Sequence, residues 1–447
     1  MKTLFSGDSR VVHIVQKNNL NPETQYRRSG FLVDCKAGDG ILLKNTLTNQ
    51  VFALSEREWD SFCKADLTWP HVRELVQYRF LVESDYDELA QYALVRSTLR
   101  TIEKKEPRIR HYTILPTTAC NARCVYCYEE GVRAVGMTAE TADAVVDFIC
   151  RTKRDGRIWL AWFGGEPLLA PKTISYISSK LQSRGVEYDS SVVTNSTLLT
   201  PEMAKEAVEL WHLKNAQVSM DGAREDYEAR KQYVHPERDN YEKAMESVAI
   251  FLDAGVKTTI RCNYDAENIS RVREFLDDCK ARFGKRKNVS LYLAQLYAFD
   301  GKDNMAGAQN ELAEAMEHLD ALGIAQKAED TKQFRVHYCM ADSNGASVVI
   351  DPNGDLYFCE HITERTAFGT VFDQNPPRFP TISDEIAEEC RSCPHLPQCT
   401  PFRKSNCTVK NAFCRREMNL STVREMLALH RKQTWTEEAE ENEPINC

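Results

Sequence analysis

The sequence predicts an α/β protein: a partial (β/α)6 TIM-like barrel, preceded by a small winged helix-turn-helix-like unit and followed by a cysteine-rich segment. Three observations predict it. Strands alternate with helices from residue 111 to about 296, short alternating strands fill residues 30–54, and cysteines gather after residue 339. Successive β/α units imply a parallel sheet with right-handed crossovers, whose chemistry sits at the carboxyl ends of the strands.

The N-terminal region reads as a small sheet with helices. Period-two alternation predicts strands at residues 30–35, 40–45 and 50–54, with turns at Asp39-Gly40 and residues 45–49. Ser55 and Glu58 form a capping-box pattern that opens a helix through about Lys64. A helix at 69–77, a wing-like strand at 78–83 and a charged helix at about 86–105 complete the unit.

The middle of the chain carries the barrel pattern. The predicted strands are 112–116, 158–162, 190–194, 216–220, 258–263 and 290–293. The predicted helices between them are 139–151, 170–182, 201–209, 241–254 and 269–283.

The remaining elements and the domain limits follow. We expect a connecting helix at 309–322, a hairpin of 346–350 and 355–358, a helix at 421–433 and an acidic tail. The domains are therefore expected at 1–105 (N-terminal unit with linker helix), 106–308 (barrel), 309–335 (linker), 336–425 (cysteine-rich domain) and 426–447 (helix end and tail).

Composition excludes several classes of protein. The 447 residues are 42% hydrophobic and 28% charged, with a net charge of −9. That charge argues against sequence-independent nucleic-acid binding, which needs a basic surface. No apolar run approaches the roughly 20 residues of a membrane span, and no secretory signal opens the chain. We expect a cytoplasmic protein with no nucleic-acid or membrane partner.

Cysteine is the outlier in this composition. A reducing compartment removes disulfides as the reason for 16 cysteines, so their clustering indicates metal ligation. Cys120, Cys124 and Cys127 follow the first barrel strand with the spacing C-x3-C-x2-C. Three thiolates on one loop can hold three corners of a [4Fe–4S] cluster and leave the fourth iron free to chelate an amino and a carboxylate group. The alternatives are a three-cysteine zinc site or coincidence.

Together with Phe163-Gly164-Gly165-Glu166-Pro167 one β/α unit later, this loop resembles the radical S-adenosylmethionine superfamily over residues 111 to about 296. The resemblance implies that an electron from the cluster cleaves S-adenosylmethionine (SAM), and that the resulting 5′-deoxyadenosyl radical abstracts hydrogen from a substrate C–H bond. The protein orients the cofactor and excludes water.

The resemblance also implies the residues that contact SAM. Gly164, Gly165, Glu166 and Pro167 match the element that binds the methionine amino group. The other matching positions are Thr194 and Asn195 (ribose and carboxylate), Ser219 (ribose) with Asp221, Arg261 (methionine carboxylate) with Asn263, and Tyr126 (adenine). For each residue, a structural hydrogen bond is the alternative.

The C-terminal cysteines resemble the SPASM extension of this superfamily, over residues 336 to about 420. Its two auxiliary [4Fe–4S] clusters would bring the total to three. One would use Cys390, Cys393, Cys399 and Cys414; the other would use Cys339, Cys359 and Cys407. Arg403 stands where the pattern has a cysteine, which leaves the fourth ligand of the second cluster open. A zinc ribbon is the competing interpretation.

The N-terminal unit resembles the recognition element of enzymes that modify ribosomal peptides, which binds a leader peptide as an added strand. A structural cap or a DNA-binding winged helix are the alternatives, although the unit's acidic and basic residues nearly balance. The leading hypothesis is an enzyme that cross-links a precursor peptide, with a Cys thioether as the product, supplied with electrons by a flavodoxin or ferredoxin. Other hypotheses are a sulfatase-maturating (formylglycine-generating) enzyme, a C–C or C–O cross-linking enzyme, and a non-catalytic iron–sulfur carrier.

Overall fold

The computed structural model describes residues 1–16, 20–103, 109–235, 239–296, 305, 307–325, 345–360, 366–375, 377–379, 386, 388–398 and parts of 422–430. The chain divides into two compact units. The first comprises Met1–Lys105, Ala328–Cys339 and Ile382–Cys447, and the second comprises Glu106–Lys327 and Met340–Thr381. Among the described residues, no helix is both long and apolar enough to cross a membrane.

The second unit contains the barrel. Its strands β7–β12 are parallel and follow one another in chain order, which confirms the predicted partial (β/α)6 barrel. They span His111–Thr117, Ile158–Gly164, Tyr188–Thr194, Leu213–Met220, Lys257–Tyr264 and Val289–Gln295. The helices are α5 (Ala139–Thr152), α6 (Pro171–Ser183), α7 (Pro201–Glu209), α8 (Arg224–Lys231), α9 (Asn240–Asp253), α10 (Val272–Phe283) and α11 (Gln309–Leu322), with short 3-10 turns at Pro167–Leu169 and Ile269–Arg271.

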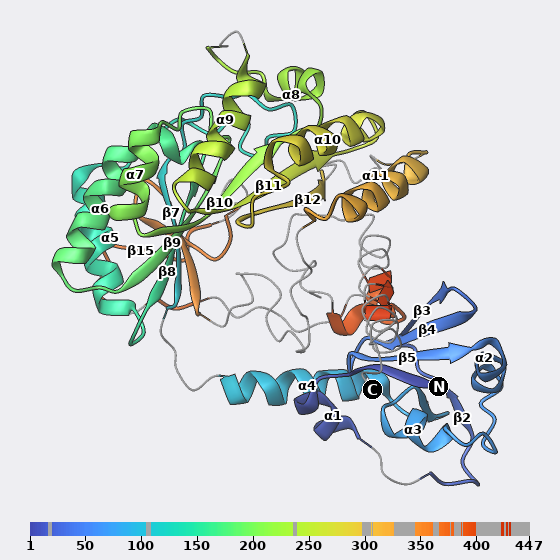
Figure 1. Cartoon of the computed structure of the whole chain (residues 1–447). Helices are drawn as coiled ribbons and strands as arrows, with labels where there is room; N and C mark the ends of the chain where they lie inside the picture. The colour runs from blue at the N-terminus through green and yellow to red at the C-terminus, as the bar shows by residue number, and fades with distance from the viewer. Residues whose placement is uncertain are drawn as a thin grey trace, which may run out of the picture. The chain divides into compact units, whose positions relative to one another are not determined.

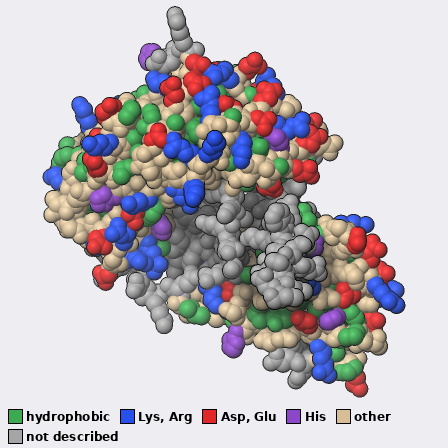
Figure 2. All heavy atoms as spheres, viewed as in Figure 1, with side chains coloured by type: hydrophobic (Ala, Val, Ile, Leu, Met, Phe, Trp, Pro, Cys, Tyr) green, Lys and Arg blue, Asp and Glu red, His purple; other side chains and the backbone are tan. Residues whose placement is uncertain are grey.

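Side chains alternate across this sheet. On β10, Ala216, Val218 and Met220 are buried, whereas Gln217 and Ser219 between them are half-buried. Figure 1 shows α5, α6, α7, α9 and α10 together on one side of the strands. The buried positions therefore supply the core, and the half-buried polar positions line the opposite, concave face. In Figure 2, charges of both signs are interspersed over the helical side of this unit.

The sheet continues beyond the first barrel strand, which the sequence pattern did not predict. The expected hairpin forms as β13 (Ser347–Ile350) and β14 (Asp355–Tyr357), and β15 (Gly369–Thr370) follows it. Strand β13 pairs in parallel with β7, so the sheet has nine strands in the order β12-β11-β10-β9-β8-β7-β13-β14-β15. The strand that leads into the Cys120–Cys127 loop therefore has a partner on both sides.

The first unit has a four-stranded antiparallel sheet in the order β1-β5-β4-β3 and a separate ribbon, β2-β6. Its strands are β1 (Lys2–Ser6), β2 (Tyr26–Arg28), β3 (Leu32–Ala37), β4 (Gly40–Asn45), β5 (Gln50–Ser55) and β6 (Leu81–Glu83). Its helices are α1 (Ser9–Val15), α2 (Glu56–Cys63), α3 (Val72–Gln77) and α4 (Glu88–Glu103), with 3-10 turns at Glu388–Cys390 and Leu396–Gln398.

Several expectations for this unit are refined. The Ser55–Glu58 capping box is present at the start of α2. The helix expected from residue 69 begins at Val72, because residues 69–71 form a turn that ends in hydrogen bonds from Val72 N to Trp69 O and from Leu75 N to His71 O. The wing-like strand is shorter than expected and pairs with β2 rather than with the main sheet.

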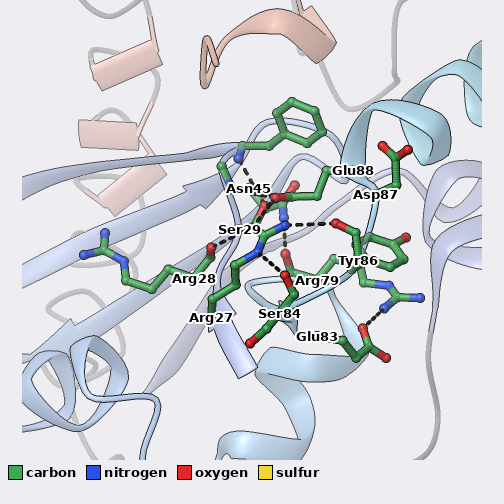
Figure 3. Close-up of polar contacts among 12 residues, drawn as sticks. Arg27, Arg28, Ser29, Asn45, Arg79, Glu83, Ser84, Tyr86, Asp87 and Glu88 are labelled. Carbon is green, nitrogen blue, oxygen red and sulfur yellow. Dashed lines mark hydrogen bonds and ion pairs between the residues drawn. The ribbon is translucent and has the colours of Figure 1, made fainter. Parts of the chain in front are cut away.

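The long helix α4 is fixed at its first turn by Glu88 (Figure 3). The Glu88 carboxylate accepts hydrogen bonds from the Ser29 hydroxyl and from Gly30 N (3.0 Å), and it pairs with Arg27 Nη1 at 2.6 Å. Arg27 Nη2 also donates to the carbonyl of Tyr86 (2.9 Å). One carboxylate thus joins the helix to the segment that leads from β2 to β3.

Residues from the C-terminal part of the chain complete this unit. Leu396 is buried in a core with Val11, Val15, Tyr92 and Val95, and Cys390 and Cys393 pack against the same core. The Thr46 hydroxyl donates to the carbonyl of Pro394. The segment 388–398 is therefore a structural part of the N-terminal unit.

Candidate active site in the barrel

The Cys120–Cys127 loop begins three residues after the end of β7. Cys120, Cys124 and Cys127 are half-buried, and none forms a disulfide. Burial raises the pKa of all three thiols, that of Cys120 to about 12, and neighbouring thiols of the loop raise the pKa of Cys120 and Cys127 further. The free thiols are therefore protonated at neutral pH, and only a bound metal would deprotonate them.

The donor set fits an iron–sulfur cluster, since three unpaired thiols share one short loop. Within the described part of the chain, no group of three His, Cys, Asp or Glu side chains converges at distances that would hold a metal ion. The loop thus supplies the ligands, and coupling of metal binding to local folding would bring the sulfur atoms together.

A second segment holds this loop by backbone hydrogen bonds. Arg123 N donates to Lys231 O (3.0 Å), Val125 N donates to Arg230 O (3.0 Å), and Val234 N donates to Asn121 O (2.9 Å). The chain reverses at Gln232, whose φ of 47° lies in the left-handed region. The end of α8 is therefore paired with the cysteine loop, and nothing in the sequence pattern predicted this contact.

Gly164 and Gly165 let the end of β8 pack directly against the same loop. A Cβ atom on Gly164 would lie 2.4 Å from Thr117 O, and a Cβ atom on Gly165 would lie 2.4 Å from Ala119 O. Gly164 also has a φ of 114°, which L-residues rarely adopt. Both glycines are thus required by the backbone packing itself, independently of any ligand.

Glu166 is 1% exposed, and protein groups already occupy its carboxylate. Oε1 accepts from the Thr194 hydroxyl (2.6 Å) and Leu168 N (2.9 Å), and Oε2 accepts from Asn195 N (2.8 Å). Burial raises the pKa of this carboxyl group. Glu166 and Thr194 therefore join the ends of β8 and β9, and Pro167 starts the short 3-10 turn that follows.

Asn195 lies beside the cysteine loop. Its Nδ2 atom donates to Asn121 Oδ1 (2.8 Å) and lies 4.0 Å from Cys120 Sγ. Its Oδ1 accepts from the Thr197 hydroxyl (2.9 Å). The structure thus brings this predicted residue to the loop.

A buried polar network joins Tyr126, Asp221 and Asn263, three of the residues assigned to SAM. The Tyr126 hydroxyl donates to Asp221 Oδ1 (2.5 Å), and Asn263 Nδ2 donates to both Asp221 Oδ1 and the Tyr126 oxygen (3.1 Å each). Lys231 completes the network at 3.3 Å from Asp221 Oδ2, and it donates to the Tyr126 oxygen (3.2 Å).

Lys231 was missed by the sequence interpretation, because a lysine at the end of a charged segment normally faces solvent. The available signal is its position four residues after Tyr227, which is fully buried. Residues i and i+4 lie on the same face of a helix. Lys231 is accordingly 3% exposed, and its pKa is well above the ordinary value because Asp221 and neighbouring groups outweigh desolvation.

Ser219 and Arg261 lie in register on the concave face, followed by Tyr292 on β12. The Tyr292 hydroxyl donates to Gln217 Oε1 (3.0 Å). Among the described residues, Arg261 Nε is buried and has no hydrogen-bond partner. An uncommitted guanidinium N–H, on a residue in register with Ser219 of the neighbouring strand, suits a carboxylate-bearing ligand.

The predicted auxiliary ligands are divided between the units. Cys359 follows β14 in the barrel unit and is half-buried, whereas Cys390 and Cys393 belong to the N-terminal unit. Cys339, Cys399, Cys407 and Cys414 lie outside the described residues. The auxiliary sites therefore stay a prediction.

Comparisons with known proteins define the class. Residues 114–279 match the family model of the Radical SAM superfamily. An uncharacterized protein of Methanocaldococcus jannaschii is 23% identical over 281 residues, which are 62% of this chain and 94% of that protein. The structure of native anSMEcpe with bound AdoMet is similar with a TM-score of 0.56 at 16% identity, over 72% of this chain and 99% of that one. Streptococcus suis SuiB gives a TM-score of 0.50 at 13% identity, over 83% and 94%.

The barrel thus carries a radical SAM domain over residues 114–279, which marks the chain as an enzyme of the radical SAM type. That class implies a [4Fe–4S] cluster and S-adenosylmethionine. The three thiols and the free Arg261 N–H are chemically suited to these two groups.

Proposed function

We propose that the chain modifies a ribosomally made precursor peptide by radical chemistry and installs an intramolecular cross-link, a Cys thioether. The observation that carries the proposal is the set of three unpaired thiols on one loop, at the carboxyl end of a strand in the matched radical SAM domain. The loop is held from both sides, by Gly164 and Gly165 at the end of β8 and by residues 230–234.

Each part of the site has a role in this proposal. Cys120, Cys124 and Cys127 hold the cluster, and Arg261 with Ser219 binds the polar groups of SAM. Glu166 and the Tyr126 network keep the surrounding backbone fixed. When bound, the cluster and SAM supply a 5′-deoxyadenosyl radical, and the half-buried concave face orients the peptide toward it.

A peptide substrate is supported by two observations. The structure of anSMEcpe with bound AdoMet and Cp18Cys peptide is similar with a TM-score of 0.54 at 17% identity, over 72% of this chain and 99% of that one. Strand β3 is the last strand of its sheet, and among the described residues β4 is its one partner. Its free edge offers main-chain groups to a leader peptide.

Thioether formation balances as follows. One C–H and one S–H bond of the peptide break, and one C–S bond forms. The hydrogen atom leaves in 5′-deoxyadenosine, the thiol proton goes to solvent, and one electron is left over, for which an oxidised auxiliary cluster would be the acceptor. Cys359, Cys390 and Cys393 are the described cysteines proposed for such clusters, and a flavodoxin or ferredoxin supplies the electron that cleaves SAM.

The first test concerns the cluster. Anaerobically reconstituted protein should bind three [4Fe–4S] clusters and form 5′-deoxyadenosine from SAM with a strong reductant. Changing Cys120, Cys124 and Cys127 together to Ala should remove one cluster and this activity, whereas Cys63→Ala, at an exposed cysteine of α2, should change neither. Persistent 5′-deoxyadenosine formation in the triple variant would contradict the proposal.

The second test concerns the peptide. A Cys-bearing peptide encoded near this chain should lose two hydrogen atoms and keep its sulfur, as mass spectrometry would show. Loss of the sulfur would instead indicate formylglycine formation. Asp34 and Cys35 are neighbours on β3, so one of them directs its N–H toward β4 and the other directs it toward the free edge. Strand addition needs the N–H at the free edge, so replacing that residue with proline should weaken leader binding about tenfold. Wild-type affinity in both the Asp34→Pro and the Cys35→Pro variants would exclude leader binding at this edge.

A further inference from the structure

Lys231 is neither a predicted cluster ligand nor a predicted SAM contact, yet it contacts the cysteine loop. Its ammonium is almost fully buried and contacts Asp221 and Tyr126, the residue between the second and third cysteines. Its own carbonyl accepts a hydrogen bond from Arg123 in the loop. One residue therefore holds the cysteine loop through both its backbone and its side chain.

The charge of Lys231 lies beside the cysteine loop as well. Its Nζ atom donates to the hydroxyl of Tyr126 (3.2 Å), which stands between Cys124 and Cys127 in that loop. Arg230, the adjacent cation, is instead paired with Asp265 (2.5 Å) and Glu267 (3.1 Å). Among the described residues, Lys231 is paired with one carboxylate, Asp221 (3.3 Å), against two for Arg230, so less of the Lys231 charge is already compensated.

We propose that Lys231 is a positioning residue that locks the cysteine loop and, by its buried charge, makes the cluster held by that loop easier to reduce. The inference rests on the proposed assignment of the cluster to Cys120, Cys124 and Cys127. Reduction moves one electron from a flavodoxin- or ferredoxin-type donor to the cluster. Lys231 keeps its proton throughout, and no bond forms at its nitrogen.

The size of the effect follows from electrostatics. A unit charge about 10 Å away, in an effective dielectric near 20, changes such an equilibrium roughly tenfold. For a one-electron couple, a tenfold change in the ratio of reduced to oxidised cluster equals 59 mV. Lys231→Met keeps the length and removes the charge, so the potential should become more negative by about this amount.

The test is an electron paramagnetic resonance redox titration of the full-length reconstituted protein. The signal of the radical SAM cluster is identified as the one that changes on addition of SAM. The variants are Lys231→Met, the double variant Lys231→Met/Asp221→Asn, and Lys205→Met as a control at an exposed lysine of α7. The double variant removes both charges of the ion pair, so its potential should return at least halfway to the wild-type value.

Several outcomes would overturn the inference. They are an unchanged potential in Lys231→Met, a shift of equal size in the double variant, and a shift of equal size in Lys205→Met. The second would show that lost packing, and not lost charge, causes the shift. Failure of both Lys231 variants to assemble the cluster would support the lock on the loop but overturn the role of the charge. If the wild-type protein shows no SAM-responsive cluster, the proposed function fails instead, so the two failures are distinguishable.

Discussion

Substitutions of Glu166 can distinguish a structural role of this residue from a role in ligand binding, because its carboxylate is hydrogen-bonded within the protein. Glu166→Ala removes the acceptor of three hydrogen bonds, from Thr194, Asn195 and Leu168, and leaves these donors buried. At about 1–2 kcal/mol for each donor, the free energy of unfolding of the barrel unit should fall by roughly 3–6 kcal/mol. Glu166→Gln keeps the shape but turns an NH2 group toward one donor, and should cost about 2–3 kcal/mol.

The assay is urea unfolding of the apoprotein, followed by tryptophan fluorescence. Trp159 and Trp162 lie on β8 itself and report on the barrel. Glu209→Gln on α7 is the control, since this glutamate is exposed and its replacement should change stability by under about 0.5 kcal/mol. A Glu166→Gln protein that unfolds at the wild-type urea concentration, yet no longer binds SAM, would refute the scaffold interpretation.

Three further predictions test the surroundings of the site. Gly165→Ala should destabilise the barrel by about 3 kcal/mol and reduce cluster incorporation, since its Cβ would meet the backbone of the cysteine loop. In the control Gly136→Ala, the added Cβ meets nothing within 4 Å, so chemical unfolding should show a change in stability of under about 1 kcal/mol. Leu396→Ala should destabilise the N-terminal unit by about 2–4 kcal/mol, because Leu396 is buried in its core. The control Leu94→Ala, at an exposed leucine, should cost under about 0.5 kcal/mol. Equal unfolding midpoints for the two variants would contradict the packing of segment 388–398 against this unit. Arg282 and Arg224 pair with Glu242 and lower its pKa from 4.5 to about 2. The stabilisation from these ion pairs, under about 1 kcal/mol, is therefore present above pH 4.5 and lost as pH falls toward 2. The stability of Glu242→Gln should converge on that of the wild type at low pH, and a constant difference would exclude the ion pairs as the cause.

Local patterns predicted the elements of this chain well. The six barrel strands and the helix Gln309–Leu322 appear where alternation and helical periodicity indicated them. The capping box at Ser55 also forms, because its two hydrogen bonds depend on residues only three apart. These features are encoded within short windows of the sequence.

Partners distant in sequence were not predictable in the same way. Periodicity indicates that residues 347–350 form a strand, but it does not state that the strand pairs with β7. The C-x2-C spacing of Cys390 and Cys393 suggests metal ligands without indicating which unit carries them. Lys231 shows the same limit: its spacing from Tyr227 indicates which helix face it shares, but not that this face meets the cysteine loop.

The parallel pairing of β13 with β7 has a consequence for biosynthesis. While the ribosome is still making the chain, β8 to β12 can assemble on one side of β7, but its other edge stays open until residues 347–350 leave the exit tunnel. An open edge beside the cysteine loop invites pairing with other nascent chains. Closure of that edge is therefore a late folding event, and iron insertion into the loop is best timed after residues 347–350 have emerged and paired with β7.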